Sequence, residues 1–162
     1  MKWPFERKNR EAPMVPFPSV ALTDEEHREC QEYLRSVIPQ SDEGAWYMPK
    51  EAADIFERSM IAQCMMGRAE RFAILRQFAE ACQAAAKACC IDPQCTHYYE
   101  FGRILEAAGK DVEARSMFVE FLRRYDADQQ NDANKNPDRA AEIRSALAPM
   151  VSYAMSKTGC ES

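Results

Sequence analysis

The sequence predicts an all-α fold, and three observations support this prediction. Apolar residues recur at intervals of three and four in most segments, which is the period of a helix buried on one side. The 162-residue chain contains only five glycines, fewer than sandwiches and barrels need for their many tight turns. No segment shows a convincing alternation of β-branched and polar residues, the pattern typical of a half-buried strand.

The first helix is predicted over Asp24–Val37. Thr23 and Glu26 have the spacing of a capping box, which marks a helix N-terminus, and Pro39 stops the apolar stripe that follows. Residues 1–22 contain four prolines, which block a regular helix, so we expect a disordered or loosely docked tail. The alternative is a short linear motif, or an arm that covers an exposed edge of the helical body.

The middle of the chain predicts two further helices after an acidic linker over 40–48. The first should cover Lys50–Met66 and end at Gly67, because glycine commonly terminates helices. The second should run without a break over Ala69–Ile91, where the apolar stripe is strong, and end at Asp92-Pro93.

The C-terminal half predicts three helices. A helix over Thr96–Ala108 should close at Gly109, and the next should begin near Asp111 and end at Tyr125. Residues 126–136 lack an apolar anchor, so we expect a polar loop there. The last helix, Pro137–Met155, should be capped by Asn136 and kinked or broken at Pro149, and Thr158-Gly159 should end it.

Charge and composition exclude several classes of function. The net charge of −5 disfavours nucleic acid and anionic membrane surfaces, because both need a basic patch. No segment approaches the roughly 18–20 apolar residues of a membrane span, and no signal-peptide pattern follows the first charges. With these features, the odd number of seven cysteines favours reduced thiols in the cytoplasm over a disulfide framework.

The cysteines and histidines are the only candidates for chemistry in the sequence. Most cysteines lie on predicted apolar stripes, so we interpret them as core residues, and Cys95, near the loop after Pro93, is the potentially reactive one. A thiol- or metal-dependent site at Cys89, Cys90, Cys95 and His97 is the alternative. The two histidines, His27 and His97, are each expected to be exposed at a helix start. Because no catalytic motif accompanies them, we predict neither an enzyme nor a cofactor or metal site.

One hairpin has residues at the positions that define a known repeat. Within Thr96–Tyr125 these are Tyr98, Phe101-Gly102, Leu105, Gly109, Ala114 and Phe118. This segment resembles a tetratricopeptide repeat, with one clear repeat over about 95–126 and a degenerate one over about 50–93. The resemblance implies a short right-handed solenoid of stacked antiparallel hairpins, with the helices Asp24–Val37 and Pro137–Met155 as caps. The predicted domain is therefore 23–157, with a disordered C-terminus over 158–162, and an unrelated helical bundle is the alternative.

The resemblance also implies a function. Tetratricopeptide domains bind peptides or helices of partner proteins through the first helix of each hairpin, and here that face should present Tyr99, Arg103 and Glu106, with Thr96 and Glu100 beside them. Trp46 and Tyr47 are a second candidate, because exposed aromatic residues often anchor a partner. We therefore expect a protein–protein interaction module or adaptor. A self-associating scaffold, such as a homodimer, remains open beside the thiol- or metal-dependent regulator.

Overall fold

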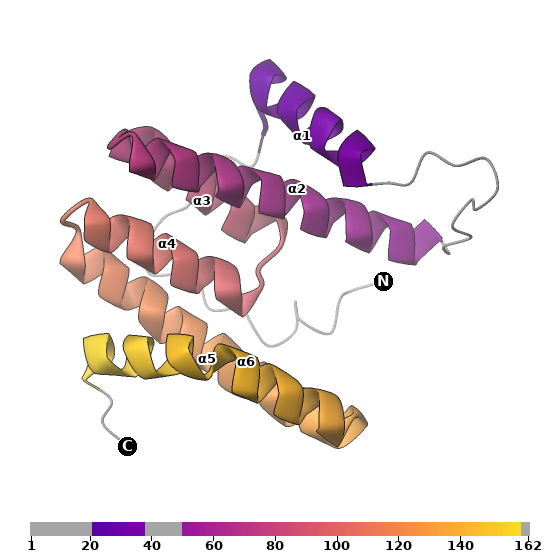
Figure 1. Ribbon diagram of the computed structural model, residues 1–162, viewed down its shortest axis with the longest axis vertical. Helices are drawn as coiled ribbons and strands as arrows, with labels where there is room; N and C mark the ends of the chain where they lie inside the picture. The colour runs from indigo at the N-terminus through magenta and orange to yellow at the C-terminus, as the bar shows by residue number, and fades with distance from the viewer. Residues whose placement is uncertain (1–20, 38–49, 160–162) are drawn as a thin grey trace.

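The computed structural model of the chain describes residues 21–37 and 50–159, and within these residues the fold is all-α (Figure 1). Trp46, Tyr47 and most of the proline-rich tail lie outside this part of the chain. The helices of the described part are α1 (Asp24–Val37), α2 (Lys50–Ile74), α3 (Phe78–Ile91), α4 (Cys95–Ala107), α5 (Asp111–Lys135) and α6 (Pro137–Thr158).

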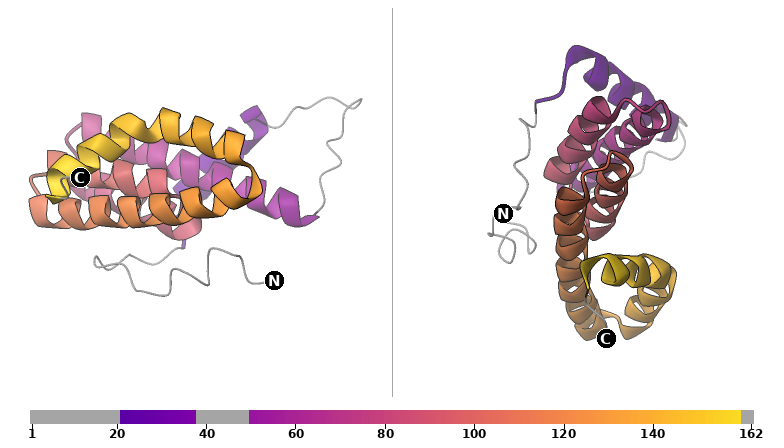
Figure 2. Two further views of the ribbon diagram at one scale, coloured as in Figure 1. Left: turned by 90° about the horizontal axis from the view of Figure 1, so that it is seen from below. Right: turned by 90° about the vertical axis from the view of Figure 1, so that its left-hand side faces the viewer.

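The helices pack as successive antiparallel neighbours. The most extensive contacts join α2 to α3, α4 to α5, and α5 to α6, while α1 packs on α2. The right-hand view of Figure 2 shows α2, α4 and α6 in one layer and α3 and α5 in a second layer beside it. Because α2 also contacts α4, the first helices of the two central hairpins lie next to one another on one face of the molecule.

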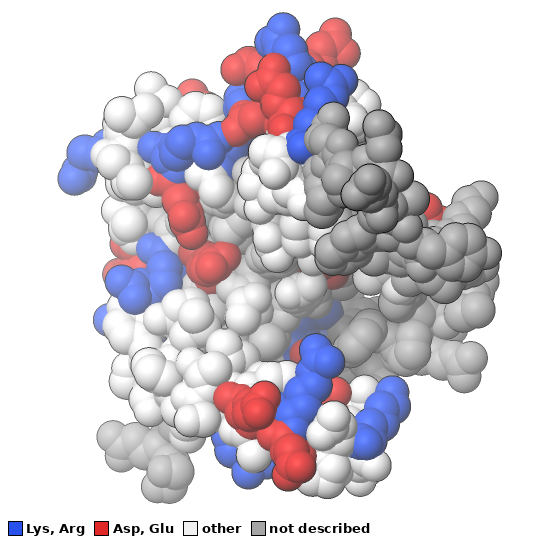
Figure 3. Space-filling model, turned by 45° about the vertical axis from the view of Figure 1, so that its right-hand side comes forward, with Lys and Arg blue, Asp and Glu red and all other residues white. Residues whose placement is uncertain are grey.

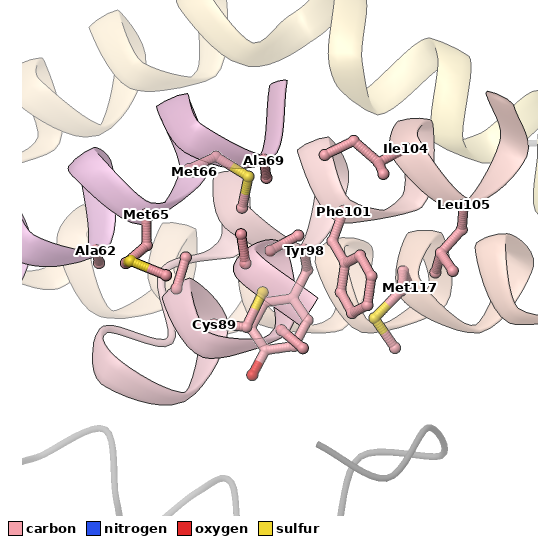
Figure 4. Close-up of a cluster of buried hydrophobic side chains, with 14 of the residues drawn as sticks. Ala62, Met65, Met66, Ala69, Cys89, Tyr98, Phe101, Ile104, Leu105 and Met117 are labelled. Atoms are coloured by element: carbon pink, nitrogen blue, oxygen red, sulfur yellow. The ribbon is translucent and has the colours of Figure 1, made fainter. Parts of the chain in front are cut away.

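A single core connects all six helices. The close-up in Figure 4 shows side chains from α2, α3, α4 and α5 meeting between the two layers, among them Met65, Tyr98 and Phe101. Helices α4 and α5 approach closely at Gly102 of α4, where an added Cβ would lie 2.7 Å from the Phe118 ring. Gly102 is thus required by the packing of α4 on α5, as expected from the sequence.

The boundaries of α1 and α4 confirm the sequence prediction. The Glu26 carboxylate accepts a hydrogen bond from the Thr23 N–H at 3.0 Å, and the Thr23 hydroxyl accepts one from the Glu26 N–H at 3.2 Å. This reciprocal pair is the predicted capping box. Gly109 and Gly159 have φ of 75° and 72°, a conformation that favours glycine, and they follow α4 and α6 as predicted.

The predicted end of a helix at Gly67 is wrong, and so is the unbroken helix over Ala69–Ile91. Helix α2 continues through Gly67 to Ile74, and the chain turns at residues 75–77, where Arg76 has a φ of 59°. A helical glycine costs only about 0.5–1 kcal/mol. Burial of Met66 and Ala69 on either side of Gly67 offsets this cost, so the helix continues and the turn falls in the following exposed segment.

The predicted polar loop over 126–136 is also wrong, because α5 extends to Lys135. This part of α5 packs against α6, and only one side of the helix is buried. Tyr125 and Gln129 are one helical turn apart and both buried, and Ala140 of α6 is buried as well. A few one-sided contacts are therefore enough to hold an otherwise polar segment as a helix.

Helix α6 begins and bends as predicted. The Asn136 side chain accepts a hydrogen bond from the Arg139 N–H at 3.2 Å, which confirms the predicted cap. The helix continues through Pro149 and changes direction along its length (Figure 1). No helix of the described residues is both long and apolar enough to cross a membrane.

Candidate functional site

A cleft of about 340 Å³ lies between α1, α2 and the first turns of α4. Tyr33 contributes to it from α1, and Met66, Gly67 and Glu70 contribute from α2. The α4 side is formed by its N-terminal residues, among them Thr96, His97 and Glu100. The cleft therefore lies where the first helices of the two central hairpins meet.

His97 is the most unusual residue of the cleft. It is only 5% exposed, and neither ring nitrogen has a hydrogen-bond partner among the described residues. Its nearest charged neighbour is Glu100, with Nδ1 3.8 Å from Oε2, which is too long for a hydrogen bond. The prediction that His97 is exposed is wrong, because α4 packs so closely on its neighbours that its first turn is buried. His27, by contrast, is exposed on α1 as predicted.

Two carboxylates also face the cleft, Glu70 from α2 and Glu100 from α4. Although Glu70 is exposed overall, desolvation raises its pKa, the charge of Glu100 raises it further, and only Arg71 lowers it. The guanidinium group of Arg71 contacts Glu29 of α1, and Arg68 Nη1 lies 2.7 Å from the same carboxylate. The nearest basic side chains of α2 are thus already paired with α1.

Gly67 lies in the wall of the cleft rather than in a helix contact. A Cβ at this position would meet a single described atom within 4 Å, Arg71 Nη1 at 3.7 Å. Packing among the described residues therefore does not require glycine here, in contrast to Gly102. Its effect is to leave the cleft open at the middle of α2.

The structure brings the predicted contact residues Tyr99, Arg103 and Glu106 together, but against α6. The Tyr99 ring packs at 80° to the Tyr153 ring, with their centroids 6.1 Å apart, and the Arg103 guanidinium lies 4.5 Å from the centre of the Tyr153 ring. Glu106 accepts a hydrogen bond from the Tyr153 hydroxyl and pairs with Lys157 at 2.8 Å. This end of the α4 face is therefore covered by the C-terminal helix, whereas Thr96 and Glu100 lie in the cleft.

The cysteines of the described residues are free, and burial raises the pKa of each. Cys95 is buried, and burial raises its pKa to about 11, so this thiol is poorly ionised, which disfavours the reactivity expected from sequence. No group of three or more His, Cys, Asp or Glu side chains within 21–37 and 50–159 is arranged to hold a metal ion. Cys89, Cys90, Cys95 and His97 are thus not assembled as a metal site.

Acidic and basic side chains alternate over the surface in Figure 3, and the described residues of this view form no continuous basic stripe. The cleft carboxylate that sequence reasoning missed is Glu70, and His97 was named only for the alternative thiol- or metal-dependent site. The sequence predicts Glu70 in the first turn of a helix over Ala69–Ile91, and no pattern places it beside α4. Comparison with models of protein families, with curated proteins and with solved structures finds no match to this chain.

Proposed function

We propose that this protein is a protein–protein interaction module, in which a segment of a partner protein binds in the cleft between α1, α2 and α4. The observation that carries the proposal is His97, a buried ring that faces the cleft with both nitrogens unpaired among the described residues. A buried polar group without a partner costs about 1–3 kcal/mol. Both nitrogens are enclosed by the protein, so a ligand that turns the ring toward the cleft would supply the missing hydrogen bonds and give this arrangement a use.

The packing supports a hairpin module of tetratricopeptide type. Helices α2 and α4 are the first helices of the two central hairpins and contact one another, and in that family the first helices form the binding face. Gly102 and Phe118, two positions of the resemblance, make a close contact between α4 and α5. In this proposal α1 and α6 are the caps of a short right-handed solenoid.

The cap α6 gives Tyr99, Arg103 and Glu106 a part in the module. Their contacts with Tyr153 and Lys157 hold α6 on α4, so a partner reaches these residues only where α6 leaves part of them accessible. Arg103 is the accessible one, with half of its side chain (51%) exposed. We keep the cytoplasm as the proposed compartment, and a homodimer is the alternative that a sedimentation measurement would distinguish.

The proposal is tested by selecting binders from a phage-displayed library of random peptides. We expect the wild-type protein to enrich peptides whose binding is lost in Gly67→Leu, because the new side chain fills the cleft. Ala79→Leu on α3 is the matched control, since Ala79 is exposed outside the cleft and the variant should keep binding. Circular dichroism of both variants verifies that they are folded.

Two outcomes would overturn the proposed function. One is the absence of any enriched peptide after selection on the folded wild-type protein. The other is a set of peptides that bind Gly67→Leu as well as wild type, which would place their binding outside the cleft.

A further inference from the structure

We infer that the cleft recognises an arginine side chain of the partner segment, with the guanidinium group held between Glu70 and Glu100 and against His97. This inference deepens the proposed function and depends on it. It specifies the chemistry of the bound residue, which the tetratricopeptide resemblance does not indicate.

The first argument is uncompensated negative charge. Glu70 has no ion pair or hydrogen bond among the described residues, and Glu100 has only the 3.8 Å contact with His97. The basic residues of α2 nearest to them are paired with α1, where Glu29 contacts both Arg68 and Arg71. On α4, Arg103 contacts Glu106 and the Tyr153 ring. A cationic ligand would therefore not compete with an existing ion pair for either carboxylate.

The second argument is the mutual effect of the two carboxylates. The charge of Glu100 raises the pKa of Glu70, so the two groups repel one another across the cleft. A cation between them would replace this repulsion by two attractions. Because the described residues offer no metal-binding group of three or more side chains, an organic cation fits better than a metal ion.

The third argument is His97, which distinguishes arginine from lysine. A neutral imidazole has one acceptor and one donor nitrogen, and both are unpaired here. Guanidinium carries five N–H donors in a planar fork, enough for two carboxylates and, once the enclosed His97 ring turns toward the cleft, for its acceptor nitrogen, whereas an ammonium group has three donors on a single atom. The cleft thus presents more acceptors than one lysine would satisfy from a single position.

A peptide suits the cleft better than a small free cation because the site also provides apolar surface and space for a backbone beside α2. Tyr33 and Met66 provide apolar wall, and Gly67 permits a close backbone approach. These features favour an arginine presented by a chain.

The first experiment uses N-acetyl-arginine methylamide as the probe and N-acetyl-citrulline methylamide as its neutral counterpart of the same shape. We expect the arginine compound to cause saturable shifts of the Glu70, His97 and Glu100 signals in heteronuclear NMR spectra, and the citrulline compound to cause none. Equal shifts from both compounds, or shifts confined to other residues, would contradict the inference.

The second experiment uses a synthetic peptide from the library selection. Replacing its arginine with citrulline should weaken binding about tenfold or more, and Glu70→Gln or Glu100→Gln should do the same to the arginine peptide. Glu80→Gln on α3 is the matched control, because Glu80 is exposed outside the cleft and should not affect the affinity. His97→Leu should also weaken binding, while lysine in place of arginine should bind at an intermediate level.

The outcomes separate this inference from the proposed function. Peptides that lose binding in Gly67→Leu but bind equally well with citrulline in place of arginine would support the interaction module and overturn arginine recognition. Spermidine bound more tightly than any arginine peptide would indicate a polyamine site and overturn both. Arginine peptides that lose affinity in Glu70→Gln and keep it in Glu80→Gln would support both.

Discussion

Two glycines inside helices have opposite surroundings. At Gly102 an added Cβ would lie 2.7 Å from Cε1 of Phe118, a ring that is only 1% exposed and cannot move away freely. At Gly67 the nearest described atom would be the flexible end of Arg71, at 3.7 Å. One glycine is therefore required by packing, and the other leaves space.

This contrast predicts opposite effects on stability. Gly102→Ala should lower the free energy of unfolding by about 1–3 kcal/mol, because it overpacks the α4–α5 contact. Gly67→Ala should raise it by about 0.5–1 kcal/mol, because alanine favours the helix. Urea denaturation followed by circular dichroism measures both values, and equal changes in the two variants would contradict the assigned roles.

His97 gives a second prediction at the scale of one residue. Leucine has no polar atoms, so His97→Leu should keep or raise the free energy of unfolding, by about 1 kcal/mol, since it removes an unpaired buried group. His27→Leu, at an exposed position of α1, should change stability by less than about 0.5 kcal/mol. A large loss of stability in His97→Leu would mean that the ring has a structural partner.

Among the elements, α1 is attached by ion pairs as well as by its buried apolar side chains Cys30 and Leu34. Lys87 of α3 lies 2.8 Å from Glu26, and Arg68 of α2 lies 2.7 Å from Glu29. Burial alone would raise the pKa of Glu26, but hydrogen bonds from Lys87 and the Thr23 N–H, with the charge of Arg68, hold it below its usual value. The attachment of α1 should therefore depend on pH.

A carboxyl whose pKa is lowered by folding stabilises the folded state above its ordinary value and loses this contribution as pH falls. For Glu26 the loss should begin near its ordinary value of 4.5 and be complete below the lowered folded pKa. We expect hydrogen exchange of α1 amides to accelerate in this range before α3 and α4 unfold. Glu26→Gln should show faster α1 exchange at neutral pH and a weaker pH dependence, and identical profiles for variant and wild type would contradict the role of Glu26.

The junction between α5 and α6 depends on one cap. Asn136→Ala removes the acceptor for the Arg139 N–H and should cost about 1 kcal/mol. Asn134→Ala, at an exposed position near the end of α5, is the matched control and should change stability by less than about 0.5 kcal/mol. Thermal unfolding of the two variants provides the comparison.

The sequence predicted helix ends well where a local group determines them. The capping box at Thr23 and Glu26, the Asn136 cap and Gly109 need only neighbouring residues, and each was identified. The prediction failed at Gly67 and over 126–136, where contacts with distant helices determine whether the helix continues. The same limit applies to the site, because Glu70 and His97 meet only when α2 and α4 pack together.

At the scale of the whole molecule, one core joins all six helices and contains most of the described cysteines. Cys30 and Cys95 have pKa values of about 12 and 11, both raised first by burial, against an ordinary value of 9.0. At about pH 8, a pKa of 11 leaves a thiol about 100-fold less ionised than an unperturbed one. These thiols should therefore react only when the fold opens.

Thiol reactivity consequently separates an interaction module from a thiol-dependent regulator. In a Cys160→Ser variant, which removes the one cysteine outside the described residues, we expect an aromatic disulfide reagent to modify the protein at least about 100-fold more slowly than it modifies the urea-unfolded chain. Half-buried Cys82 and Cys90 should react first among the remaining six. Rapid modification of Cys95 in the folded protein would instead favour the regulator, because a buried thiol can react quickly only if its environment opens or ionises it. Since one core contains these groups, the slow phase should accelerate with urea in parallel with global unfolding.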